Sequence, residues 1–226
     1  MWQPDGWGWR ARIGVLTPHA DIGPEAELRA MAPDGVSIHA ARIPLGVYAA
    51  GGKMDQTIGD DPVRTFADPP HVDDAAELLA AAPLHAIVYG FTSSSYVRGA
   101  ADDAVLKNRL ETRTRGIPVI IPCAAAALAL ASLGVTKLAL INPPWFSVEL
   151  SQKGAGYFQG KGFEVVHHGP AGLPSDQTSA PSIPASSMSG SAPIHLRTLK
   201  LSSLAATAFA ALALSRLWKK TLRGRC

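Results

Sequence analysis

The sequence predicts an α/β fold in which helices cover both faces of parallel β-sheets. Three observations predict it. Up to about residue 170, short apolar runs typical of buried strands alternate with longer segments typical of helices. Glycine and proline separate most of these segments. A chain of 226 residues with 47% hydrophobic and 17% charged residues can also bury the core of one domain or two small lobes.

The first half of the chain supplies three strands and three helices. In chain order we expect a strand at 12–17, a helix at 25–31, a strand at 36–43, a helix at 72–82, a strand at 86–89 and a helix at 101–114. Pro18 ends the first apolar run, RIGVLT. Asp73 and Asp74 lie in the first turn of their helix, where the helix dipole favours negative charge. The run GFTSSSYVRG at 90–99 is expected to be a loop.

The next segment continues the alternation. We expect a strand at 119–121, a helix at 124–133, a strand at 137–141, a helix at 147–161 and a strand at 163–167. Gly116 and Pro118 separate the first of these strands from the preceding helix, and Gly134 and Gly162 are typical helix stops. Because folds of this class bind ligands beyond the carboxyl ends of their strands, the loops at those ends are the places to look for a site.

The charge of the chain gives no reason to expect nucleic-acid binding. The net charge is +3, but all eighteen acidic residues and fourteen of the twenty-one basic residues lie within 1–177. This part therefore carries a net charge of −4, and the basic character belongs to the tail. A basic stripe typical of nucleic-acid binding is not seen.

Composition also argues against metal, disulfide and secretory classes. Two cysteines give no sign of a disulfide framework or a zinc site, and the seven histidines lack ligand spacing. Residues 1–10 contain three tryptophans but no basic segment followed by an apolar one, so they do not resemble a secretory signal. We expect a cytoplasmic protein.

The character of the chain changes at residue 178. Residues 178–193 are rich in Ser, Pro and Ala, residues 199–214 are almost all Leu, Ala and Ser, and no acidic residue occurs in the last 49 positions. Read one base out of frame with GC-rich codons, 197–222 yields a strand, a small-residue turn and an acidic helix, which is the order a further βα unit requires. We therefore predict that a single-base frameshift near 176–178 replaced the native end, which resequencing the gene would test.

The alternative is a genuine tail. Residues 216–225, RLWKKTLRGR, could then form a basic amphipathic helix on a membrane surface, after a disordered linker. The apolar stretch before them is shorter than the ~20 residues that span a bilayer, so we expect no membrane span.

A hydroxyl-rich segment follows the strand at 86–89. Thr92, Ser93 and their neighbours place hydroxyl and backbone N–H groups together between a strand and a helix, which is an arrangement that binds carboxylates. The alternative is that Thr92 and Ser93 only cap the helix that follows.

The run T-S-x-S-x-x-R-G at 92–99 resembles a loop of the arylmalonate decarboxylases, within the branch of the aspartate/glutamate racemase superfamily that also contains the maleate cis-trans isomerases. The opening IGVLTP, the segment LASLGVTKLALINP and the closing KGFEVV occur in the order and spacing of that family. The resemblance covers about 165 residues, from 12 to 176.

The resemblance implies two Rossmann-like lobes with parallel sheets related by a pseudo-dyad. It divides the chain into an N-terminal lobe at 12–116, a partial C-terminal lobe at 117–177 and the atypical tail at 178–226. In this family the last residues complete the N-terminal lobe, so a replaced tail implies an incomplete fold. Thr92 and Ser93 correspond to residues of a dioxyanion hole that holds the substrate carboxylate.

Departures from the family pattern concern the proton-transferring groups. Racemases and isomerases place a cysteine just before the loop, where this chain has Gly90 and Phe91. The decarboxylases lack that cysteine and use a second one, which is expected in the replaced tail. Because the protein sequence does not fix the matching codon in the shifted frame, the catalytic residues stay unassigned.

Other departures concern substrate binding. Pro144 replaces a tyrosine of the oxyanion site, for which Asn142 or Trp145 would have to compensate. Asp21 replaces an asparagine that contacts a carboxylate in the isomerases, and a negative charge there argues against maleate as substrate.

Cys123 follows a strand that, by the resemblance, lines the cleft. A helix N-terminus there would lower the pKa of its thiol, whereas a small buried residue that only packs is the plainer interpretation. Contact with a ligand is compatible with either, but a nucleophile's role is not supported.

The predicted function is therefore that of a cofactor-independent isomerase or lyase acting on a small carboxylate through an enediolate-like intermediate, impaired by its altered end. The alternative is a non-catalytic protein that binds or senses a small carboxylate. A homo-oligomer is compatible with either.

Overall fold

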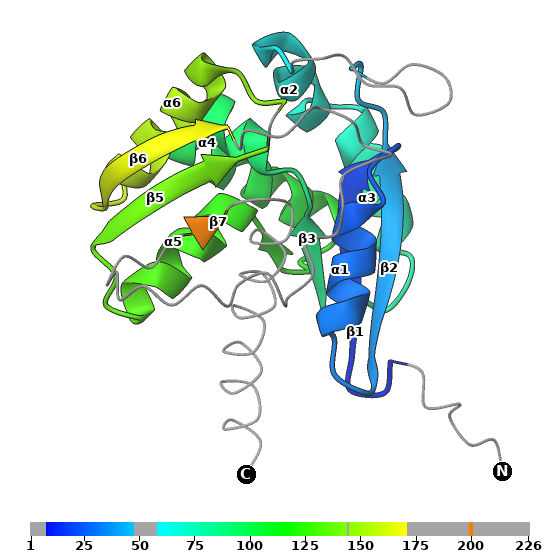
Figure 1. The fold of residues 1–226 in the computed structure, drawn as a ribbon. Coiled ribbons are helices and arrows are strands. Elements are labelled where there is room, and N and C mark those ends of the chain that lie inside the picture. Colours follow the sequence, from blue (N-terminus) through cyan, green and yellow to red (C-terminus); the bar gives the residue numbers. More distant parts are fainter. Residues whose placement is uncertain (1–7, 48–57, 144, 171–198, 201–226) are drawn as a thin grey trace, which may run out of the picture.

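The structure, a computed structural model, describes residues 8–47, 58–143, 145–170 and 199–200. It is an α/β fold whose paired strands are all parallel, and the predicted fold class is confirmed (Figure 1). The predictions made for the tail, including the frameshift and the surface helix, lie outside the described residues except at 199–200.

The larger sheet has four strands in the order β2-β1-β3-β4. These are β1 (Ala11–Pro18), β2 (Val36–Ile43), β3 (Ala86–Tyr89) and β4 (Val119–Ile120). Both of its faces are covered. Ile13 and Val15 pack with Leu28 on one face, whereas Leu16 joins the main core on the other, as the alternation of side chains along a strand requires.

The smaller sheet has three strands in the order β6-β5-β7. These are β5 (Lys137–Asn142), β6 (Glu164–Pro170) and β7 (Leu199–Lys200). The main hydrophobic core is continuous between the two sheets, because Tyr89 of β3 and Leu140 of β5 belong to one buried cluster. β4 pairs with β3 although it lies beyond the lobe boundary predicted at 116.

Six helices occur in the described part of the chain. They are α1 (Gly23–Met31), α2 (Asp60–Ala67), α3 (His71–Leu79), α4 (Thr92–Arg113), α5 (Pro122–Ser132) and α6 (Val148–Gln159). α2 was not predicted from the sequence. α5 begins two residues earlier than predicted, because proline suits the first position of a helix.

The loop predicted at 90–99 is largely helical, which corrects that prediction. α4 begins at Thr92 and is interrupted at Gly99, whose φ of 82° and ψ of 174° are not helical. A φ of that sign suits glycine, which has no Cβ to clash. α4 therefore consists of a short first part, 92–98, and a longer second part, 100–113.

Candidate functional site

The candidate site begins where β3 ends. The N–H of Gly90 donates a hydrogen bond of 2.6 Å to the carbonyl of Leu16 in β1. A Cβ at Gly90 would lie 2.9 Å from the same carbonyl oxygen, closer than real side chains approach backbone. Glycine at this position therefore lets β3 turn against β1 and leads the chain directly into α4.

The first turn of α4 has no side-chain cap. Its N-cap is Phe91, which has no side-chain oxygen, and no side chain accepts a cap hydrogen bond there. The interpretation of Thr92 and Ser93 as caps is therefore wrong. The Ser94 hydroxyl donates instead to the carbonyl of Phe91 over 3.2 Å. Because the first N–H groups of a helix have no partner within it, a bound anion can accept from them.

A buried amide faces α4 from the end of β5. Asn142 is only 2% exposed, and its Oδ1 accepts a hydrogen bond of 3.2 Å from the hydroxyl of Tyr96. Tyr96 lies one helical turn after Thr92, so the two side chains share a face of α4. The Nδ2 of Asn142 has no hydrogen-bond partner in the described structure. A buried donor without a partner is costly, and a ligand oxygen would satisfy it.

Cys123 lies at the start of α5 and touches the same turn. Its sulfur is 3.8 Å from the carbonyl oxygen of Thr92, and the residue is 1% exposed. Burial raises the pKa of the Cys123 thiol, and the nearby Asp103 carboxylate raises it further. The lowered pKa considered for this position is therefore wrong, and the thiol stays protonated at neutral pH.

Asp21 lies beyond the end of β1, and its carboxylate binds the backbone at the start of α1. Its Oδ1 accepts a hydrogen bond of 2.9 Å from the N–H of Gly23 at the start of that helix. Burial raises the pKa of Asp21, which this hydrogen bond and the charge of Arg42 partly offset. No described contact joins Asp21 to Thr92 or Asn142.

The remaining predicted cleft residues divide between core and loop. Phe91 is buried, and its ring centroid lies 4.3 Å from that of Phe66. Trp145 packs against the core, and its carbonyl accepts a hydrogen bond of 3.3 Å from the N–H of Ile58. Pro144 lies outside the described residues.

Sequence analysis missed a buried polar cluster behind the first turn of α4. Asp103 accepts hydrogen bonds from the hydroxyls of Ser95, at 2.9 Å, and Tyr157, at 2.8 Å. The residues lie 8 and 54 positions apart from Asp103, and no local pattern indicates such contacts.

Tyr96 also requires a glycine in α6. A Cβ at Gly154 would lie 2.5 Å from the Tyr96 ring, so Gly154→Ala is expected to destabilise the fold by about 1–3 kcal/mol through overpacking. Gly156 in the same helix is the matched control, because nothing lies within 4 Å of its Cβ position. There the alanine should stabilise by about 0.5–1 kcal/mol. Urea denaturation of both variants measures the two changes, and equal effects would contradict the predicted close packing.

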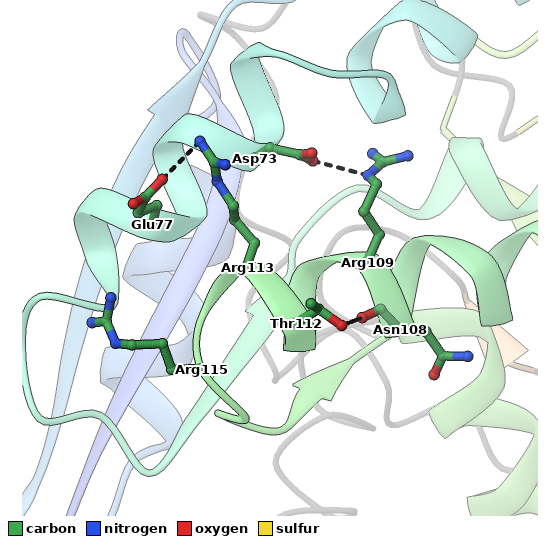
Figure 2. A pocket seen from close by; sticks show the side chains of 7 residues that line it. All are labelled: Asp73, Glu77, Asn108, Arg109, Thr112, Arg113 and Arg115. Carbon is green, nitrogen blue, oxygen red and sulfur yellow. Dashed lines mark hydrogen bonds and ion pairs between the residues drawn. The ribbon is translucent and has the colours of Figure 1, made fainter.

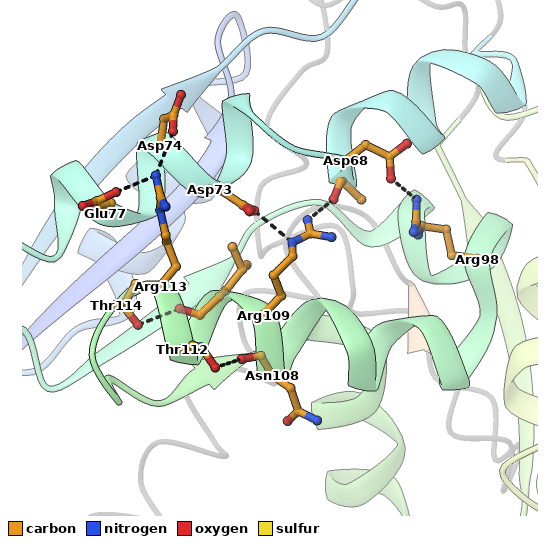
Figure 3. Close-up of polar contacts among 12 residues, drawn as sticks. Asp68, Asp73, Asp74, Glu77, Arg98, Asn108, Arg109, Thr112, Arg113 and Thr114 are labelled. Carbon is orange, nitrogen blue, oxygen red and sulfur yellow. Dashed lines mark hydrogen bonds and ion pairs between the residues drawn. The ribbon is translucent and has the colours of Figure 1, made fainter.

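The surface between α3 and α4 carries a shallow open pocket, which lies away from this turn (Figure 2). Most of its charges are already paired, since Arg109 binds Asp73 at 3.0 Å and Arg113 binds Glu77 at 2.7 Å, while Arg115 donates to the carbonyl of Ala80. Figure 3 shows that these pairs belong to a network tying α4 to α3 and to the end of α2. This pocket is therefore part of helix packing.

The described part of the chain contains no candidate membrane span and no candidate metal site. None of its helices combines the length and apolar character needed to cross a bilayer. Nor do three or more of its His, Cys, Asp and Glu side chains gather as metal ligands would.

Comparisons with known proteins identify the fold. No protein-family model matches the chain, and no curated protein matches it significantly. Among solved structures, the Nocardia farcinica maleate cis-trans isomerase bound to TRIS superposes with a TM-score of 0.65, at 17% identity over 91% of this chain and 92% of that chain.

Two further structures represent the same branch. A cysteine-to-alanine variant of the maleate isomerase Iso from Pseudomonas putida S16, with maleate, has a TM-score of 0.60 and 18% identity over 73% of this chain and 64% of that chain. A glycine-to-cysteine variant of arylmalonate decarboxylase, in a sulfate-associated form, has a TM-score of 0.54 and 23% identity over 72% and 63%. The chain thus spans less than two thirds of the length of either protein. The fold is the one that the sequence resemblance implied.

Proposed function

We propose that this chain, which shares its fold with maleate cis-trans isomerases and arylmalonate decarboxylases, is an enzyme of the isomerase or decarboxylase type. Its substrate is a small carboxylate, its reaction passes through an enediolate-like intermediate, and it uses no cofactor. One observation carries the proposal: Tyr96, one turn after Thr92 in the uncapped start of α4, binds a buried amide, Asn142, whose N–H group has no partner among the described residues.

The first turn of α4 would hold the carboxylate. Thr92 and Ser93 supply two hydroxyls, and their backbone N–H groups have no partner within the helix. Donors of this kind act most strongly on charge that develops during the reaction, because they are already in place and largely shielded from water. Ser93 is buried, so a hydrogen bond from its hydroxyl would be poorly screened.

The buried amide would bind a second oxygen. Tyr96 holds the Oδ1 of Asn142 and thereby leaves Nδ2 as the donor. In an enediolate the negative charge is shared by two oxygens, and donors from α4 and β5 would stabilise both. This role of Asn142 replaces that of the family's tyrosine, whose position is Pro144 here.

Proton transfer requires a group that the described residues do not supply in a reactive form. Phe91 occupies the position of the first family cysteine, and its ring is packed in the core. The thiol of Cys123 has a raised pKa and is almost completely buried. We therefore assign proton donation to a thiol in the native C-terminal segment.

The same observation favours a second candidate function. Without a reactive thiol, the residues around Thr92 would bind a small carboxylate and release it unchanged, as a binding or regulatory protein does. Turnover distinguishes the two functions. Incubation of the protein, with its reading frame restored, with phenylmalonate or maleate, followed by NMR, shows new carbon–hydrogen signals only if the protein is an enzyme.

Substrate charge is a further part of the proposal. Asp21 stands where the isomerases carry an asparagine that contacts a carboxylate. Its side chain accepts a hydrogen bond from the backbone at the start of α1. A negative charge at this position is therefore expected to weaken the binding of maleate.

The double variant Thr92→Ala/Ser93→Ala tests the site. It removes two hydroxyl donors to a charged group, so we expect phenylmalonate to bind about 10- to 100-fold more weakly. Isothermal titration calorimetry measures the affinity. Thr112→Ala is the control, because this exposed hydroxyl of α4 bonds only to the carbonyl of Asn108. Unchanged affinity of the double variant for phenylmalonate would contradict the proposed function.

A further inference from the structure

Asp103 is a buried carboxyl group that the proposed reaction does not use. It is 5% exposed and lies in the second part of α4. Both of its oxygens are engaged by neutral donors, Oδ1 by the Ser95 hydroxyl and Oδ2 by the Tyr157 hydroxyl. Among the ion pairs of the described residues, none involves Asp103.

The two hydrogen bonds of Asp103 join three pieces of structure. Ser95 belongs to the first part of α4, Asp103 to the second part, and Tyr157 to α6. Gly99 lies between Ser95 and Asp103 and interrupts the helix. The regular geometry of the helix is therefore broken between 92–98 and 100–113. Two side-chain contacts cross the break: the hydrogen bond from Ser95 to Asp103 and the ion pair of Arg98 with Asp102 at 3.7 Å.

A second contact to α6 acts on the same short segment. Tyr96 is the residue after Ser95, which bonds to Asp103, and the Tyr96 ring packs against Gly154 of α6. The segment 92–98 is thus held by α6 and by the second part of α4, and at Val97 and Arg98 it also contacts α2 and the residue after it. The first turn of this segment, which has no side-chain cap, contains Thr92 and Ser93.

We propose that Asp103 is a positioning residue, which through Ser95 and Tyr157 sets the orientation of the first turn of α4 and hence of the carboxylate donors Thr92 and Ser93. The inference rests on the proposed function for its consequence in binding. Its structural part, the holding of 92–98 by Asp103, is testable without any ligand.

The energetics support a role beyond packing. A carboxyl group buried without a cation is unfavourable, and apolar side chains of similar size commonly stabilise such a position more. Burial raises the pKa of Asp103, with the hydrogen bonds from Tyr157 and Ser95 offsetting part of the effect. Since a raised carboxyl pKa means that ionisation opposes folding, Asp103 contributes most to stability at acidic pH, and this contribution is lost as the pH rises through its folded pKa.

Several groups face Asp103 from the surrounding elements. Tyr157 and Lys161 approach from α6 and the residues after it, Cys123 from α5, Tyr89 from β3, and Asp102 from α4 itself. Only Lys161 carries a positive charge, and it does not form an ion pair with Asp103 in the described structure.

The experiment compares Ser95→Ala and Asp103→Asn with a control of similar burial. Thr114→Val removes a buried hydroxyl at the opposite end of α4, where Thr114 donates to the carbonyl of Leu110 over 2.8 Å. Hydrogen–deuterium exchange of the full chain is followed in peptides that cover 92–98. We expect faster exchange there in Ser95→Ala and Asp103→Asn and wild-type exchange in Thr114→Val.

Binding of phenylmalonate to the same proteins gives the second readout. Ser95→Ala and Asp103→Asn should weaken affinity about fivefold or more, as expected when donors to a charged group are misaligned, whereas Thr114→Val should leave it unchanged at a similar loss of thermal midpoint. Affinity that follows the midpoint equally in all three variants would overturn the inference.

The two proposals fail in different ways. If Thr92→Ala/Ser93→Ala loses affinity while Ser95→Ala and Asp103→Asn retain both affinity and slow exchange, the inference about Asp103 is wrong and the proposed function stands. If the variants speed exchange at 92–98 but wild type does not bind phenylmalonate or maleate, the holding role of Asp103 stands and the proposed function is wrong.

Discussion

Replacing Phe66 with alanine is expected to lower the free energy of unfolding by about 3–5 kcal/mol. Phe66 is 2% exposed at the end of α2, and its ring contacts those of Phe91 and Tyr89, with centroid distances of 4.3 and 5.8 Å. The alanine would leave a cavity beneath the residues that connect β3 to α4. Aromatic pairs add about 0.5–1.5 kcal/mol to the burial energy, which favours the upper part of this range.

This loss of stability in Phe66→Ala is large, because domains are stable by only about 5–15 kcal/mol. Urea denaturation followed by circular dichroism measures the change. Leu78→Ala is the control, since Leu78 is 77% exposed on α3 and its loss should change stability by less than about 0.5 kcal/mol. A Phe66 variant as stable as this control would mean that α2 does not pack against β3 as described.

Replacing Asn142 with aspartate is expected to weaken phenylmalonate binding by about 100-fold or more. The change keeps the oxygen that accepts from Tyr96 and exchanges the Nδ2 donor for a second oxygen. A ligand carboxylate would then lose a hydrogen bond from a buried amide and meet a negative charge. Both effects act in the same direction and are poorly screened by water, because Asn142 is buried.

Asn108→Asp is the matched control. It makes the same chemical change on α4, but Asn108 is exposed beside the surface pocket (Figure 2). We expect its affinity to equal that of wild type. Titration calorimetry at neutral pH compares the two, and circular dichroism verifies that both are folded. Equal affinity in Asn142→Asp and wild type would show that Nδ2 does not face the ligand.

The sequence determined the fold class because its signals are local. The runs at 12–17, 36–43 and 86–89 are apolar or alternating within a few residues, and the structure contains a strand at each. Glycine and proline mark their ends, so strand and helix positions could be predicted to within a few residues.

The two errors in the predicted elements have a common cause. The segment 90–99 contains three successive serines and two glycines, which do not favour a helix, yet Ser93, Ser94 and Ser95 are buried and helical. α2 begins with two aspartates and a proline and has only a short apolar face. In both places burial against other elements outweighs local preference.

The candidate site was only partly visible in the sequence. Thr92 and Ser93 were predicted from their position between a strand and a helix, and they remain the proposed carboxylate donors. Tyr96 and Asp103 gave no signal, because each acts through a residue far along the chain: Asn142, 46 positions from Tyr96, and Tyr157, 54 positions from Asp103.

The sequence by itself therefore determined which segments are strands and helices, that the sheets are parallel, and where a hydroxyl-rich turn lies. Only the tertiary structure decided that this turn is uncapped, that the Nδ2 of the buried Asn142 finds no partner among the described residues, and that the Cys123 thiol stays protonated. The physical reason is the distance along the chain over which each kind of interaction acts. Periodicity and turn propensity act between near neighbours in the chain, whereas capping, burial and pKa depend on contacts that exist only once β3, β5, α4 and α6 have packed together.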